Sequence, residues 1–212
     1  DGVLHVVNPA KPQNGQVSVE LEELWRIGGD SEDENEFFGV IVRVTSDEAG
    51  NVYLLDTQLS EVKIFDKNGQ FVRTIGREGE GPGEFRRPSD LFFVPGGNLG
   101  VLQTAPAKIV LLTKDGKPAG DYPTPKIQGE GFLTVSGARL AGDRLVCMAQ
   151  AGNFNQEKGT FTQTMMMRGV DKDGHVVADY HTEERLWEFS NPVIAEPTWD
   201  TIQNRWDVSP DG

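Results

Sequence analysis

The chain has 212 residues, and its 33 acidic side chains outnumber the 20 basic ones, which gives a formal net charge of −13 at pH 7. This balance excludes the clustered basic surface that nucleic-acid binding requires. Apolar residues make up 37% of the chain, enough for a packed core, but the longest aliphatic run covers only residues 109–112, too short to span a bilayer. The single cysteine, Cys147, cannot form an intramolecular disulfide or a cysteine-based zinc site, so we expect stability to come from packing.

Short apolar runs separated by turn residues predict four consecutive strands in the first third of the chain. Residues 40–55 contain two runs joined by a turn at 48–50, and residues 62–75 contain two more joined by a turn at 67–69. The second turn holds an Asn-Gly pair, which favours a two-residue hairpin because both residues tolerate a positive φ. No helical period intervenes, so we expect one antiparallel sheet over residues 40–76 rather than a parallel βαβ arrangement.

The same pattern recurs with a period in the middle forties. Gly50-Asn51 is followed 47 residues later by Gly97-Asn98, and Gly142-Asp143 follows after a further 45 residues. Four short strands per period of this length are typical of a β-propeller blade, so the predicted fold class is all-β, a propeller of four-stranded antiparallel blades. The predicted boundaries are a closing strand at 17–28, blades at 37–76, 85–122 and 131–181, an insert at 151–160 in the third blade, and the start of a fourth blade at 199–212.

Two segments resemble a known family. Residues 79–88 (GEGPGEFRRP) and 47–57 (DEAGNVYLLDT) are similar to NHL-repeat propellers, in particular to bacterial six-bladed ones, and the resemblance covers residues 25–116. It implies a binding scaffold rather than a particular chemistry. It also implies a periplasmic or extracellular location after removal of a signal peptide, with membrane association only through a partner or a lipid anchor. Since open sheet edges invite aggregation, we expect further blades beyond Gly212 to close a six-bladed ring.

One face of such a propeller is the expected partner surface. It carries the loops between the two middle strands of each blade and the connectors between blades, and these include an acidic loop, a mixed-charge connector and the insert. Mixed charges favour a protein partner or a larger envelope complex over nucleic acid, although a merely solvated acidic loop remains an alternative. The predicted partner-binding residues are Asp30, Glu32, Asp33, Glu34, Glu36, Arg77, Glu80, Arg86, Arg87, Asn153, Phe154, Asn155 and Lys158.

Residue types that commonly carry chemistry do not converge in the sequence. The three histidines lack the spacing of a helical zinc site, and Cys147 lies in an apolar strand with no nearby histidine to activate it. Residues 165–167, three consecutive methionines, are predicted to alternate across a strand, and core packing is favoured for them over a metal-binding or flexible recognition role. Residues 171–174 lack the EF-hand order and are interpreted as a turn. Residues 183–189 are interpreted as a short helix or rim loop whose Trp187 would anchor a partner.

Two functions follow from this pattern. The first is a non-catalytic binding or assembly module of the bacterial cell envelope, with no catalytic, cofactor or metal-binding residues. The alternative is a calcium-dependent lactonase or hydrolase, whose propeller would hold a metal in the channel with Glu, Asn and Asp side chains. Asn51 and Asn98 do not support the alternative, because they lie in turns on the opposite face.

Overall fold

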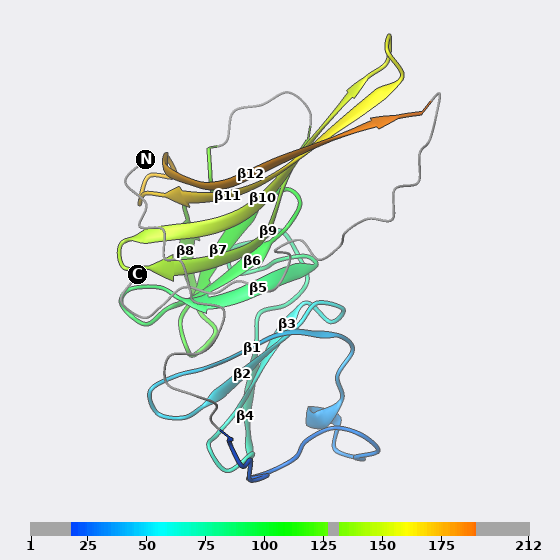
Figure 1. The fold of residues 1–212 in the computed structure, drawn as a ribbon. Helices are drawn as coiled ribbons and strands as arrows, with labels where there is room; N and C mark the ends of the chain where they lie inside the picture. Colours follow the sequence, from blue (N-terminus) through cyan, green and yellow to red (C-terminus); the bar gives the residue numbers. More distant parts are fainter. Residues whose placement is uncertain (1–17, 127–131, 190–212) are drawn as a thin grey trace.

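The structure is a computed structural model, and it describes residues 18–126 and 132–189. Within these residues the chain forms three antiparallel sheets of four strands, and the strands of each sheet follow one another in chain order (Figure 1). The described residues contain no α-helix, only the short 3-10 helix η1 (Glu34–Glu36). The predicted all-β architecture of four-stranded antiparallel blades is therefore confirmed, whereas residues 199–212 lie outside the described residues.

The first two sheets are built from strands of five or six residues, and the third from much longer ones. The first sheet contains β1 (Ile41–Ser46), β2 (Val52–Asp56), β3 (Glu61–Phe65) and β4 (Phe71–Ile75). The second contains β5 (Pro88–Phe93), β6 (Leu99–Gln103), β7 (Lys108–Leu112) and β8 (Pro118–Tyr122). The third contains β9 (Phe132–Ala141), β10 (Arg144–Asn155), β11 (Thr160–Val170) and β12 (Val176–Glu188). The expected sheet over residues 40–76 is the first of these.

Five hairpin turns share one geometry, which explains the recurring glycines. The N–H of the first turn residue donates to the carbonyl of the fifth, and the N–H of the fourth donates back to the first, at 2.8–3.0 Å. The fourth residue is always a glycine with φ between 77° and 84°, a region that side chains disfavour. Asn68 does not share the positive φ of Gly69, so the expected two-residue hairpin is wrong. The five turns are residues 47–50, 66–69, 94–97, 113–116 and 171–174.

Two apolar cores join the three sheets face to face. Leu55, Val62 and Ile75 form a cross-strand row on the first sheet that packs against the second. In the second sheet a row in the matching register packs against the third, and it consists of Leu102, Ile109 and Tyr122. The first and second sheets therefore each offer one apolar row to the sheet that follows in the chain, as consecutive blades do.

The structure corrects two local expectations. The extra residues 151–160 lengthen β10 and β11 as a hairpin rather than forming a long loop, because the two strands pair as far as Asn155 and Thr160. Residues 183–188 belong to β12 and not to a helix or rim loop, since they pair with β11 along their length. Residues 18–28 are not paired in a strand, and the closing strand stays a prediction, because its expected partners lie outside the described residues.

Candidate functional surfaces

A single lysine holds the backbone of the acidic loop before β1. Lys63 Nζ donates to three backbone carbonyls of residues 34–37 at 2.7–3.2 Å. The carboxylate of Glu36 accepts the N–H of Gly28 at 3.1 Å, so this acid has a structural role. The remaining predicted acids, Asp30, Glu32, Asp33 and Glu34, are exposed. Asp33 caps η1, since its Oδ1 accepts the backbone N–H and the side-chain amide of Asn35 at 2.9 and 2.8 Å. The loop therefore presents a row of exposed carboxylates on a well-anchored backbone.

The connector between β4 and β5 pairs most of its own charges. Arg77 contacts Glu84 at 2.5 Å, and Arg86 contacts Glu80 at 2.7 Å. The N–H of Gly81 also donates to Glu84, and this bond, helped by Arg77, holds the pKa of the Glu84 carboxyl below its usual value. Three of the four predicted charges in this connector thus form internal ion pairs, which sequence spacing did not reveal.

A buried ionic cluster links the first strands of all three sheets. Asp90 on β5 contacts Arg43 on β1 at 3.2 Å and also pairs with Arg139 on β9. Its side chain is 4% exposed and accepts two further bonds, from the N–H groups of Leu91 and Ala138 at 2.9 Å. Sequence reasoning missed this cluster, although Arg43 and Asp90 stand 47 residues apart and thus at the same position of the repeat. The carboxylate is fully engaged in joining sheets.

The other buried carboxylate also serves the backbone. Asp56 is 0% exposed and accepts the N–H groups of residues 39, 40, 58 and 59 at 2.6–3.1 Å. Burial by itself would raise the pKa of Asp56, but these four donors outweigh it and lower the pKa. Asp56 is thus an ionised brace between the entry to β1 and the β2–β3 turn.

Two further groups of reactive side chains lie outside these loops and clusters. An exposed turn brings together one potential ligand atom each from Asp171, Asp173 and His175, and these atoms lie within 4.8 Å of one another. One Asp171 oxygen already accepts the N–H groups of Asp173 and His175 at 2.8–2.9 Å, as expected for a turn. Cys147 is fully buried, and burial raises the pKa of its thiol to about 12, so it is not an activated nucleophile.

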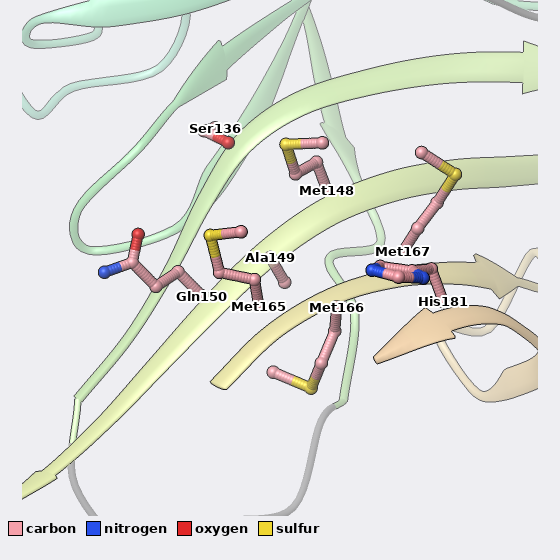
Figure 2. A pocket seen from close by; sticks show the side chains of 8 residues that line it. All are labelled: Ser136, Met148, Ala149, Gln150, Met165, Met166, Met167 and His181. Carbon is pink, nitrogen blue, oxygen red and sulfur yellow. The ribbon is translucent and has the colours of Figure 1, made fainter. Parts of the chain in front are cut away.

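The outer face of the third sheet carries a small pocket of about 20 Å³. Figure 2 shows Met148, Met165 and Met167 on one side of the sheet, with His181 beside Met167 and with Met166 turned the other way. Only Met166 belongs to the core between the second and third sheets. The expected alternation of the three methionines across a strand is therefore confirmed, but the expected core packing holds only for Met166, because Met165 and Met167 lie on the opposite face of β11 (Figure 2).

The long strands of the third sheet end in an aromatic arm, which we define as residues 152–163 and 185–189. Phe154, Phe161 and Trp187 are direct cross-strand neighbours on the pocket face. The Phe132 ring stacks on Phe161 with centroids 6.2 Å apart, and Phe189 lies 5.8 Å from Phe154. Phe154 and Phe189 remain 56% and 60% exposed. Of the predicted insert residues, Phe154 lies in this cluster, whereas Asn155 and Lys158 form the hairpin end.

The predicted surface elements are spread over the molecule rather than gathered in one patch. In Figure 1 the end of the β10–β11 hairpin projects beyond the body, whereas the acidic loop around η1 lies beside the first sheet at the opposite end. No helix among the described residues is long and apolar enough to cross a membrane. A partner that touched both elements would have to extend along the three sheets.

Residues 11–116 match the family described as 6-bladed beta-propeller, and no curated protein matches the chain. A candidate exported protein of Bacteroides fragilis is 14% identical, with a TM-score of 0.50, over 72% of this chain and 40% of its own. A protein of unknown function from Bacteroides caccae is 19% identical, with a TM-score of 0.45, over 64% and 47%. An inactive virginiamycin B lyase from Staphylococcus aureus, solved with quinupristin, is 14% identical, with a TM-score of 0.40, over 72% and 56%.

The chain thus spans 40–56% of the length of these three structures. At 14% identity, the likeness to the Bacteroides fragilis protein shows the fold and nothing finer. The family match covers half of the chain, and the three four-stranded sheets have the corresponding architecture. The chain therefore belongs to the 6-bladed beta-propeller family.

Proposed function

We propose that the protein is a non-catalytic binding module of the bacterial cell envelope whose protein partner docks on the aromatic arm. The single observation that carries the proposal is the exposed aromatic cluster on strands longer than the fold requires. The first two sheets form complete four-stranded units with strands of five or six residues, so the additional residues of β10–β12 are not needed for a blade. Two observations support the envelope setting. Residues 47–57 and 79–88 resemble NHL repeats, and the Bacteroides fragilis relative is described as an exported protein.

The arm has the composition of a protein-binding hot spot. Large aromatic side chains supply most of the binding energy in protein interfaces, and they do so best when rigid neighbours hold them in place. Phe161 is held by Phe132, whose ring lies over Gly152: a Cβ at that glycine would be 2.3 Å from it. Arg185 and Glu183 form an ion pair at 2.8 Å next to the aromatic row and would supply a polar rim.

The charged loops add a second, electrostatic contribution. The acidic loop and Arg87 are exposed, whereas Arg77, Glu80 and Arg86 are paired within the connector. Exposed charges of this kind mainly change the association rate and its dependence on salt. We therefore assign the affinity to the arm and the steering to the acidic loop.

The described residues offer little to the alternative of a calcium-dependent hydrolase. Asp90, on the first strand of the second sheet, forms ion pairs with two arginines. The side chain of Asp56 accepts hydrogen bonds from four backbone N–H groups. Neither has an oxygen free for a metal ion of six to eight ligands. Bound calcium together with lactone hydrolysis by the purified chain would support the alternative.

The test compares two double variants in capture from an extract of the native organism. Phe154→Ser with Phe189→Ser removes the exposed rings of the arm, and Val72→Ser with Val44→Ser removes exposed apolar side chains of the first sheet. A partner identified with the unchanged protein should bind the arm variant at least tenfold more weakly, and the control with unchanged affinity, when purified partner is titrated. Equal affinity of the arm variant and the unchanged protein, with both folded by circular dichroism, would contradict the proposal.

A further inference from the structure

Three potential metal ligands stand side by side on the open face of the third sheet. Met148 on β10 is the direct partner of Met167 on β11, and Met167 is the direct partner of His181 on β12. Neighbours of this kind have their Cβ atoms about 4.5–5.5 Å apart. All three line the pocket in Figure 2, and Met165 lies two residues along the same strand face. Two thioether sulfurs and an imidazole are thus placed around one small cavity.

The chemistry of this row differs from that of the two rows in the same register. The first sheet has Leu55, Val62 and Ile75 at these positions, and the second has Leu102, Ile109 and Tyr122. These rows are aliphatic or aromatic and are covered by the next sheet. Packing against a neighbouring sheet therefore needs no sulfur or imidazole. In the third sheet every member of the row has a lone pair that can bind a soft cation.

We propose that Met148, Met167 and His181 bind a soft monovalent metal ion, Cu(I), with Met165 as a neighbouring thioether. Thioethers are neutral, polarisable ligands that favour Cu(I) and bind hard cations such as Ca²⁺ or Mg²⁺ poorly, and imidazole also suits copper. The unbranched methionine side chain has three rotatable bonds, so adjacent sulfurs can turn toward a common ion. The site is independent of the aromatic arm and of the proposed partner.

The charged groups around the row do not compete for the ion. Glu183 lies two residues from His181 on β12, and it forms an ion pair with Arg185. The other residues along the pocket carry no charge, and they are Ser136, Ala149, Gln150, Met165 and Met166, of which Met166 has its side chain turned to the other side of the sheet (Figure 2). Neutral ligands leave the charge of a bound cation uncompensated, and one uncompensated charge costs less free energy than two. The site therefore favours Cu(I) over divalent ions.

The experiment measures metal binding by the purified chain with the metal alone. Ag(I), an air-stable ion with the same ligand preference, is titrated by calorimetry, and Cu(I) is titrated without oxygen against the chelator bicinchoninate. We expect one equivalent to bind, with affinity reduced at least tenfold in Met167→Leu and in His181→Leu. Met166→Leu is the matched control, because Met166 lies on the same strand but in the opposite core, and it should bind metal as the unchanged protein does.

Two results would overturn the proposal. One is the absence of stoichiometric binding of either ion to the folded chain. The other is an equal loss of affinity in Met166→Leu and Met167→Leu, which would show that the methionine row is not the site. Methyl NMR signals of Met148 and Met167 should shift on addition of Ag(I) while that of Met166 stays in place, and a reversed pattern would also exclude the site.

Discussion

The strands follow chain order in all three sheets, but the first two sheets and the third differ in the length of their strands and in how much of one face is covered. In the first and second sheets, the strands have five or six residues, and their apolar rows are buried against the next sheet. In the third sheet, strands of 10–13 residues extend beyond the neighbouring sheet and carry methionine, histidine and aromatic residues on an open face. The shared part of the pattern specifies the blade, and the departures mark the surface available for binding.

This difference separates residues that hold the sheets together from residues that remain available to ligands. Asp90, Leu102 and Ile109 lie between sheets and are satisfied within the protein. Met148, His181 and Phe154 have only part of their surface covered. Substitutions in the first group should therefore change stability, whereas substitutions in the second group should change binding with little effect on folding.

The largest expected effect comes from the ionic cluster between the sheets. Asp90→Asn removes the negative charge between Arg43 and Arg139 and leaves two partly buried guanidinium groups with one neutral acceptor. Breaking a buried ion pair by removing one partner costs about 3–5 kcal/mol. We expect a loss of this size in the free energy of unfolding, measured by urea denaturation.

An exposed pair provides the control for Asp90. Arg73 and Asp115 also join neighbouring sheets, at 2.6 Å, but their side chains are 45% and 68% exposed. Surface ion pairs contribute about 0–1 kcal/mol, so Asp115→Asn should leave the denaturation midpoint nearly unchanged. Equal losses in the two variants would mean that the cluster around Asp90 is open to solvent and that it does not join the sheets.

A second comparison uses two residues in the same register of neighbouring sheets. Leu102 is 0% exposed between the second and third sheets, whereas Met148 occupies the corresponding position on the open face. Leu102→Ala should cost about 2–5 kcal/mol through lost burial and the cavity that remains. Met148→Ala should cost less than half as much. Equal losses in the purified chain would show that the face of Met148 is covered in solution, which would also argue against metal access.

The blade architecture could be predicted because its signals are local. Gly50, Gly69 and Gly97 each occupy the fourth turn position, where φ is positive, so their spacing reports the spacing of the hairpins. The alternation of residues 40–55 likewise reports two paired strands. The length of the third sheet could not be read in this way, because Asn155, Thr160 and Thr162 interrupt the apolar alternation although they pair across the β10–β11 hairpin.

The candidate surfaces were less accessible to sequence reasoning than the fold. The ion pairs of Arg77 and Arg86 depend on how one connector folds back on itself. The metal-binding row depends on which members of the methionine run share a face with His181, and β-bulges near Met148 and Met167 shift that register. Residue type alone singled out Phe154 and Trp187 as candidates for partner contact, which stays a prediction, whereas their clustering became visible only from the paired strands.

The smallest predicted effect is a loss of stability at low pH, and it distinguishes a turn of the first sheet from the matching turn of the second. Asp47 begins the β1–β2 turn and accepts hydrogen bonds from the Asn51 side chain at 3.1 Å and from Lys114 of the second sheet at 3.0 Å. Burial by itself would raise the pKa of Asp47. These donors together with Tyr53 outweigh that effect and bring the pKa well below its usual range. The matching turn of the second sheet begins with Val94, which has no carboxylate to protonate.

A carboxyl whose pKa is depressed by folding stabilises the folded state fully above its unfolded pKa, about 3.9, and loses that contribution as the pH falls toward the folded value. Unfolding free energies measured between pH 6 and pH 2 should therefore decline below about pH 4.5 in the unchanged protein. In Asp47→Asn they should start about 1–2 kcal/mol lower at pH 6, because hydrogen bonds to a charged acceptor are lost, and decline less steeply. Asp66→Asn changes an exposed turn carboxylate whose pKa is also lowered, and it should flatten the acid limb less than Asp47→Asn does. Parallel curves for Asp47→Asn and the unchanged protein would show that Asp47 is not the residue through which acid weakens the contact between the first two sheets.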